Sequence, residues 1–274
     1  MDFDINMTYT DEQETFRKEV RAWLEQNAPK RVFAAEDVDL TRDDAIALKD
    51  WQRKLGGKGW LVPTVSKELG GGGLAPQHAV VINEELAARS LPGGGPGILM
   101  PAIMIHGTEE QKQRFVKPTF LGEYTVWQVF TEPEAGSDLA SLRTRGVRDG
   151  DEWVVNGSKQ FVGSNRKPDY LFTLVNTNPD APRHENISLM MINAQLPGVT
   201  IAPMDLVGGG AKQFVFFDNV RVPADCLIGQ EGKGWAMANT TLELEHGGSG
   251  TVGGGARGSG RFGLVEKVID YLQA

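Results

Sequence analysis

Two stretches of this sequence carry residue types that could do chemistry. The first is TLELEH at residues 241–246, where Glu243 and Glu245 end an apolar run and nine of the next seventeen residues after His246 are glycine. A carboxylate in an apolar pocket gains proton affinity and can act as a general base. Residues two apart on a helix point in different directions, so only one glutamate could serve a given substrate atom. The alternative is that both are solvated helix residues.

The glycine-rich run at residues 247–263 allows two interpretations. Each glycine costs about 1 kcal/mol relative to alanine inside a helix, so this run would not form a helix unaided. It is either a linker-like segment or a helix held by its neighbours, in which the missing side chains leave room for a bulky ligand group. We favour the second interpretation because helical periodicity resumes at residues 264–273, and Arg257 and Arg261 would then share one helix face.

The second stretch is VWQVFTEPEAGSDLASL at residues 126–142, which gathers small residues and hydroxyls. Backbone N–H groups and hydroxyls around Thr131, Gly136 and Ser137 could approach a flat, hydrogen-bond-rich ligand or a phosphate. An ordinary Pro-Gly turn capped by Asp138 explains the same residues. These residues alone therefore do not distinguish a ligand-binding loop from an ordinary turn.

Composition narrows the classes of function. The 274 residues are 40% hydrophobic, which is enough for two or three domains. Apolar runs are too short for a membrane span, and the acidic N-terminus is unlike a signal or transit peptide, so a cytoplasmic protein is expected. The single cysteine, Cys226, excludes an internal disulfide framework and cannot by itself build a zinc site, so we predict no metal site. A net charge of -8 argues against nucleic acid as the main partner.

The pattern of apolar residues predicts helices in the first part of the chain. Residues 10–29 begin with a capping box of Thr10 and Gln13 and place apolar residues on one face at helical spacing. Further helices are predicted at residues 45–55, 78–90 and 108–118, with glycine clusters between them.

After about residue 125 the pattern favours strands. Short segments rich in Val, Phe, Trp and Thr are punctuated by Asp149-Gly150 and Asn156-Gly157, which favour tight hairpin turns. Helical periodicity returns from Gly232. Its apolar residues are expected to form an exposed face: Trp235, Met237, Leu242 and Leu244. The strands are predicted at residues 143–148, 152–156, 170–176, 187–193, 199–203 and 213–222.

The stretch TEPEAGSDLASLRTRGVRDGDEWVVNGSKQF resembles the flavin-binding signature of the acyl-CoA dehydrogenase family. Ahead of it stand GW at 59–60, ELGG at 68–71, EELA at 84–87 and GTEEQKQRFVKPTFLGE at 107–123. Behind it stands FVFFDNVRVPADCLIGQEGKGW at 214–235, in the family's order and spacing. The resemblance implies an α+β multidomain fold: an N-terminal helical domain (1–125), a middle β-barrel domain (126–230) and an incomplete C-terminal helical bundle (231–274).

The resemblance implies FAD as the cofactor. Gln128, Val129, Phe130 and Thr131 would follow the flavin edge, and Gly136 and Ser137 would serve FAD or the CoA part of a substrate. The second flavin strand would carry Phe161 where the family commonly has Trp, and Val162 and Gly163 where it commonly has Ile and Thr. Gly163 lacks a hydroxyl that often hydrogen-bonds the flavin. Phe161 is either a cofactor-stacking residue, which we favour, or a core aromatic.

The reaction implied by the resemblance is α,β-dehydrogenation of an acyl-CoA thioester. Family members carry the base either late in the C-terminal bundle, beyond this sequence, or on the first bundle helix, where the alignment places Glu245. His246 stands where Arg is usual, and Glu243 and His246 would lie beside the substrate. The following glycines would then suit a bulky acyl group.

The resemblance also implies partners. An electron-transfer flavoprotein would accept the electrons, and the family's dimer contacts imply a homo- or hetero-oligomer. Two other functions stay open: a non-catalytic flavin- or CoA-binding subunit, or truncated fragment, that needs a partner chain, and a flavin oxidase on the same fold.

Overall fold

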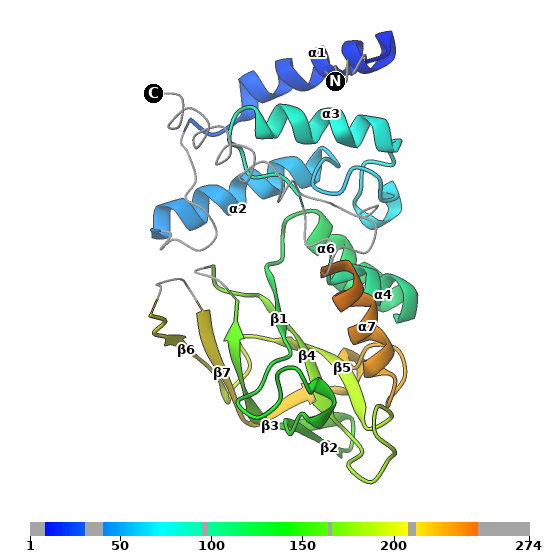
Figure 1. Ribbon diagram of the computed structural model, residues 1–274, viewed down its shortest axis with the longest axis vertical. Coiled ribbons are helices and arrows are strands. Elements are labelled where there is room, and N and C mark those ends of the chain that lie inside the picture. Colours follow the sequence, from blue (N-terminus) through cyan, green and yellow to red (C-terminus); the bar gives the residue numbers. More distant parts are fainter. Residues whose placement is uncertain (1–8, 31–40, 95–97, 164–165, 208–211, 246–274) are drawn as a thin grey trace, which may run out of the picture.

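A computed structural model describes residues 9–30, 41–94, 98–163, 166–207 and 212–245. Along the chain it contains a helical part, a curled β-sheet and one further helix, α7, which returns to the junction of the first two (Figure 1). The predicted order of helices, strands and helix is confirmed. The expectations for residues 246–274, which include His246, the glycine run and the helix at 264–273, lie outside the described residues.

Three long helices form the N-terminal part. The first, α1 (Asp11–Asn27), begins at Thr10, and the predicted capping box with Gln13 is present. The others are α2 (Arg42–Gly57) and α3 (Pro76–Ala87), and the 3₁₀ turn η1 (Lys67–Leu69) lies between these two. Their facing sides bury a shared core of large side chains, among them Val20, Leu24, Trp51, Leu55, Trp60, Val81 and Ile82.

A cluster of ion pairs joins α1 to α3. The Glu85 carboxylate, whose side chain is 4% exposed, accepts hydrogen bonds from Arg17, Arg21 and Arg89 at 2.7–3.0 Å. Burial alone would raise the pKa of Glu85, but the hydrogen bonds from the three arginines outweigh it and lower the pKa to about 2. The ionised carboxylate therefore contributes to the attachment of α3 to α1.

A second helical stretch leads into the sheet. It consists of α4 (Met100–His106), α5 (Glu109–Gln111), the π-helical turn η2 (Lys112–Val116) and α6 (Lys117–Phe120). The helix predicted at 108–118 corresponds to the last three of these. The helix α4 was not predicted, because its seven residues are too few to show a helical period.

Seven strands form one curled sheet with the order β1-β4-β2-β3-β7-β6, and β5 pairs with the other side of β4. Strands 170–176 and 187–193 are confirmed to the residue, and the Asp149-Gly150 hairpin joins β2 to β3 as predicted. The short 3₁₀ turns η3 (Leu139–Ser141) and η4 (Ala224–Cys226) lie outside the strands. The strands are β1 (Val126–Val129), β2 (Arg145–Asp149), β3 (Glu152–Val162), β4 (Tyr170–Asn176), β5 (Ile187–Asn193), β6 (Val199–Met204) and β7 (Lys212–Pro223).

The hairpin predicted at Asn156-Gly157 is wrong. These residues lie inside β3, which continues to Val162, and the register with β7 shifts between Val155 and Gly157. Gly157 has a φ of 148°, and a Cβ there would come within 2.6–2.8 Å of Thr144. The glycine therefore permits a bulge and a close strand contact, which is the other common use of glycine in a strand.

The last described helix, α7 (Gly234–Glu245), packs on α4 and β5. The expectation that its apolar residues form an exposed face is wrong for Met237, which is 1% exposed and lies in the main core. Trp235, Leu242 and Leu244 are half-buried, and the first two pack against the same core. The sheet and α4 supply the surface that covers this face. Among the described residues, no helix combines the length and apolar character needed to cross a membrane.

The Glu85 cluster predicts an acid-sensitive helical domain. Because the folded-state pKa of Glu85 is depressed, its stabilising effect is present above the unfolded-state pKa near 4.5 and is lost as the pH falls toward about 2. Glu85→Gln should lower the free energy of unfolding by about 3 kcal/mol at pH 7 and by much less at pH 3. Denaturant titrations at both pH values measure this. Glu19→Gln, at an exposed position on α1, is the control, and equal losses at both pH values would contradict the prediction.

Candidate functional site

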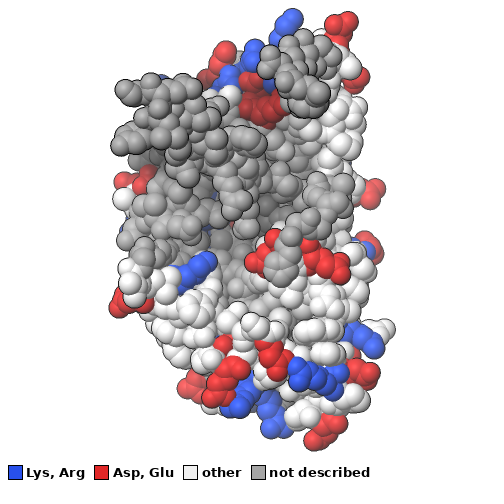
Figure 2. Space-filling model, in the orientation of Figure 1, with Lys and Arg blue, Asp and Glu red and all other residues white. Residues whose placement is uncertain are grey.

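The end of α7 meets the end of β1. Glu245, in the last turn of α7, accepts a hydrogen bond from the side-chain amide of Gln128 at 3.2 Å. Glu243 and Glu245 are both exposed, and acidic side chains gather where the last turn of α7 reaches the surface in Figure 2. Of these two glutamates, Glu245 is the one with a hydrogen bond to the predicted flavin edge among the described residues. The structure thus brings together two predicted site residues that are 117 positions apart.

The two segments predicted to follow the flavin also lie side by side. The backbone N–H of Gln160 donates to the carbonyl of Thr131 at 2.9 Å, so the end of β3 returns to the residues that follow β1. Residues 128–131 and 161–163, the two segments expected to serve the flavin, therefore form one rim of the curled sheet. We call these seven residues the rim.

The rim residues differ in which of their groups are exposed and could contact a ligand. The side chains of Val129, Phe130 and Val162 are at most 4% exposed, so they pack in the core and could offer a ligand only their backbone. Gln128 and Thr131 are half-buried. Phe161 is 53% exposed and has a φ of 56°, which is uncommon for a bulky residue. Its ring is therefore not a core aromatic but an exposed face at the rim.

A buried ion pair lies directly behind the rim. Lys159, one residue before Gln160, is completely buried, and its ammonium contacts Glu132 Oε1 at 2.8 Å. The same ammonium donates to the carbonyls of Phe130 at 3.0 Å and Leu174 at 2.9 Å. These three acceptors match the three N–H donors of an ammonium group. Lys159 therefore ties β3 to β4 and to the chain that follows β1.

Glu132 extends this network into the loop after β1. Its carboxylate accepts the backbone N–H groups of Arg143 at 2.6 Å and Thr144 at 2.9 Å. Burial alone would raise the pKa of Glu132, but the charge of Lys159 and the hydrogen bonds lower it. Burial lowers the pKa of Lys159 to about 8, and the charge of Glu132 only partly offsets this. Sequence reasoning missed both residues, because an isolated lysine in a strand is normally solvated.

Gly136 and Ser137 stand on the exposed part of that loop. A Cβ on Gly136 would meet no atom within 4 Å, so open space surrounds it. The neighbouring Asp138 pairs with Arg183 from the loop between β4 and β5. Beside Arg183, the ring of His184 stacks on Trp235 of α7 with the ring centres 4.3 Å apart. Neither Arg183 nor His184 was singled out from the sequence.

The structure gives a steric reason for glycine at position 163. Gly163 has a φ of 72°, and a Cβ there would lie 2.4–2.6 Å from ring atoms of Trp127 in β1. Any side chain at this position would collide with the indole. The departure from the family pattern noted at Gly163 is therefore coupled to the large residue at position 127.

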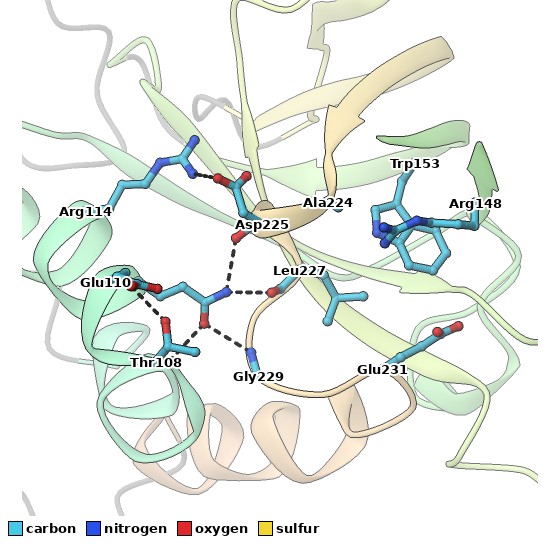
Figure 3. Close-up of a pocket in the computed structure, with 11 residues that line it drawn as sticks. Thr108, Glu110, Arg114, Arg148, Trp153, Ala224, Asp225, Leu227, Gly229 and Glu231 are labelled. Atoms are coloured by element: carbon cyan, nitrogen blue, oxygen red, sulfur yellow. Dashed lines mark hydrogen bonds and ion pairs between the residues drawn. The ribbon is translucent and has the colours of Figure 1, made fainter. Parts of the chain in front are cut away.

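A separate cavity of about 580 Å³ lies between α5 and the segment that leads into α7 (Figure 3). It contains none of the predicted site residues. The side-chain amide of Gln111 donates to the carbonyls of Asp225 at 3.1 Å and Leu227 at 2.7 Å, and its oxygen accepts from the N–H of Gly229 at 3.2 Å. These bonds fix the start of the segment that carries α7 and Glu245.

Comparison with known proteins agrees with the fold. Residues 10–123 match the family described as "Acyl-CoA dehydrogenase, N-terminal domain", and residues 128–220 match "Acyl-CoA dehydrogenase, middle domain". The acyl-CoA dehydrogenase FadE29 of Mycobacterium tuberculosis is 34% identical over 84% of this chain and 60% of its own length. The chain thus spans about three fifths of that curated relative.

Two solved structures show the same fold. The "Tcur3481-Tcur3483 steroid ACAD G363A variant" has a TM-score of 0.78 and 30% identity, covering 96% of this chain and 68% of that chain. The ChsE4-ChsE5 complex from Mycobacterium tuberculosis has a TM-score of 0.69 and 29% identity, covering 87% of this chain and 61% of that chain. Matched domains in the same order, together with these similarities, establish that the chain belongs to the acyl-CoA dehydrogenase family.

Proposed function

We propose that this chain binds FAD at the rim and that Glu245 is the base for α,β-dehydrogenation of an acyl-CoA thioester. The hydrogen bond between Gln128 and Glu245 carries this proposal, because it brings a carboxylate on the first bundle helix to the predicted flavin edge. Membership of the acyl-CoA dehydrogenase family supports the reaction class.

The residues at the rim fit a flat aromatic cofactor. Phe161 offers an exposed ring, held at the rim by a left-handed backbone that is unfavourable for a bulky residue, and such strain is typical of binding sites. The indole N–H of Trp127 is buried without a hydrogen-bond partner among the described residues, which suits a ligand that brings an acceptor. Gln128, Thr131 and Phe161 would hold the isoalloxazine, with the backbone of Val129, Phe130, Val162 and Gly163. FAD supplies the acceptor for the β-hydrogen and its electron pair.

Glu245 would take the proton from the carbon next to the thioester carbonyl. A base must reach this proton within hydrogen-bond distance, and the side chain of Gln128 orients the carboxylate by donating to one of its oxygens. Glu243 is two residues away, so it points about 200° around the helix and cannot address the same carbon. We propose that Glu243 lies beside the substrate, a role that the resemblance also implies for His246. Gly136 and Ser137 would contact FAD or the CoA part of the substrate.

The titles of similar structures support proposals about the acyl group and the partners. We propose a bulky acyl group, since one similar structure is titled a steroid ACAD. We also propose a homo- or hetero-oligomer, because the similar ChsE4-ChsE5 structure is a complex of two named proteins. An electron-transfer flavoprotein would accept the electrons.

A second candidate function is supported by the same two-protein complex. In this second function, the chain binds flavin or CoA without catalysing the reaction, and a partner chain supplies the base. The visible absorption spectrum of the purified protein separates the two functions. Bound flavin that bleaches on addition of acyl-CoA supports the enzyme, whereas bound flavin that keeps its colour supports the binding subunit.

Glu245→Gln should slow flavin reduction by acyl-CoA at least about 100-fold and leave FAD bound, because the amide keeps its size but cannot take a proton. Stopped-flow absorbance measures the rate. Glu243→Gln, also exposed on the last turn of α7, is the matched control. Because Glu243 would lie beside the substrate without reaching the α-carbon, this variant should at most change the affinity for acyl-CoA and should reduce its flavin at the parental rate when acyl-CoA is saturating. If Glu245→Gln reduces flavin as fast as the parent, the base lies elsewhere.

Phe161→Leu should weaken FAD binding about 3- to 10-fold, because the exposed ring loses its stacking contact. The melting temperature of the apoprotein should change little, since the side chain is 53% exposed. Fluorescence quenching of added FAD measures the affinity. Phe216→Leu is the control, because Phe216 is a 41% exposed ring on the neighbouring strand β7, outside the rim. Equal weakening by both variants would argue against stacking at Phe161.

A further inference from the structure

Trp127 and Gly163 form a large-and-small pair between β1 and the end of β3. An ideal Cβ on Gly163 would lie 2.4 Å from Cδ2, 2.5 Å from Cε2 and 2.6 Å from Cε3 of the Trp127 ring. Real Cβ atoms do not approach other atoms so closely. The indole therefore occupies the space into which a side chain at position 163 would project.

The nitrogen of this indole has no hydrogen-bond partner in the part of the chain that the structure describes. Trp127 is 6% exposed, and its Nε1 is buried without a hydrogen-bond partner among the residues that the structure describes. Cε2 is the ring carbon bonded to Nε1, so the N–H group lies beside Gly163. A buried N–H group without a partner is costly, and such groups in folded proteins commonly have a partner that the protein itself does not supply.

The position of this N–H group is informative. Gly163 is its neighbour in space, and Gln128, which contacts Glu245, is the next residue in the chain; both belong to the rim. The indole N–H can only donate, so its missing partner must be an acceptor. The isoalloxazine ring carries acceptor nitrogen and carbonyl oxygen atoms along its edge, whereas a wholly apolar ligand would leave the N–H group unpaired.

We propose that Trp127 takes the place of the missing side chain at position 163 and donates its indole hydrogen bond to an acceptor on the edge of the isoalloxazine ring. This inference rests on the proposed function, because it assumes that FAD binds at the rim. Gly163 is then a specific requirement of this arrangement, since it makes room for the indole that carries the donor.

The test uses the full chain, freed of flavin, with its six tryptophans labelled with nitrogen-15 at the indole. The indole resonance of Trp127 is assigned by its absence from Trp127→Phe, which keeps an aromatic ring and removes the N–H group. On titration with FAD, this proton resonance should move downfield and exchange more slowly with solvent. Trp127→Phe should bind FAD about 3- to 10-fold more weakly than the parent.

Trp153→Phe is the matched control. Trp153 is also buried, at 3% exposed, and its Nε1 is likewise unpaired among the described residues, but it lines the separate cavity at the opposite end of β3 (Figure 3). Its replacement should leave FAD affinity unchanged, and its indole resonance should not respond to FAD. This control separates a donor at the rim from a general effect of removing a buried indole.

The outcomes are distinct. If the parent binds FAD but the Trp127 resonance does not move, or if Trp127→Phe binds FAD as tightly as the parent, this inference is wrong and the proposed function stands. If the parent binds no FAD, the proposed function fails, and this inference fails with it. If Trp127→Phe does not fold, the other five Trp→Phe variants assign the Trp127 resonance by elimination. Its response to FAD in the parent then tests this inference.

Discussion

The rim depends on the buried contact between Lys159 and Glu132. One ammonium group binds the Glu132 carboxylate and the carbonyls of Phe130 and Leu174, and the carboxylate in turn holds the N–H groups of residues 143 and 144. Strands β3 and β4 and the segment between β1 and β2 thus converge on two buried charges. Removing one partner of such a pair leaves the other charge buried without a partner, which typically lowers the free energy of unfolding by about 3–5 kcal/mol. The backbone on which the cofactor would lie is therefore held in place by two charges that pair with each other.

Contacts from two helical segments also position the proposed base. Gln111 fixes the chain at residues 225–229, and the following helix α7 buries Met237 against α4 and the sheet. The Glu245 carboxylate is therefore positioned by contacts from the helical part and the sheet together. The rim and the base belong to different parts of the chain, and the hydrogen bond from Gln128 to Glu245 is where they meet.

The sequence predicted what depends on local pattern and missed what depends on contacts between distant residues. Strands 170–176 and 187–193 were predicted to the residue because they are short, mostly apolar segments bounded by polar residues. Asn156-Gly157 was misread as a turn, because the same dipeptide permits a bulge when a neighbouring strand passes close by. Gly163 was seen as a departure from the family pattern, but its cause is the ring of Trp127, 36 positions earlier. The resemblance to a family assigned Gln128 and Glu245 to one site, but their hydrogen bond was not predicted, since periodicity says nothing about which strand a helix end meets.

The burial of Lys159 also has a chemical consequence. An amine with a pKa of about 8 is partly uncharged near neutral pH, and an uncharged amine is a nucleophile. Thioesters acylate such amines, so a protein that handles acyl-CoA would risk modifying its own lysines beside the site. Lys159 has no exposed surface, and its ammonium group contacts three acceptors. Burial thus lowers the pKa of the Lys159 amine and also keeps that amine out of reach of a thioester.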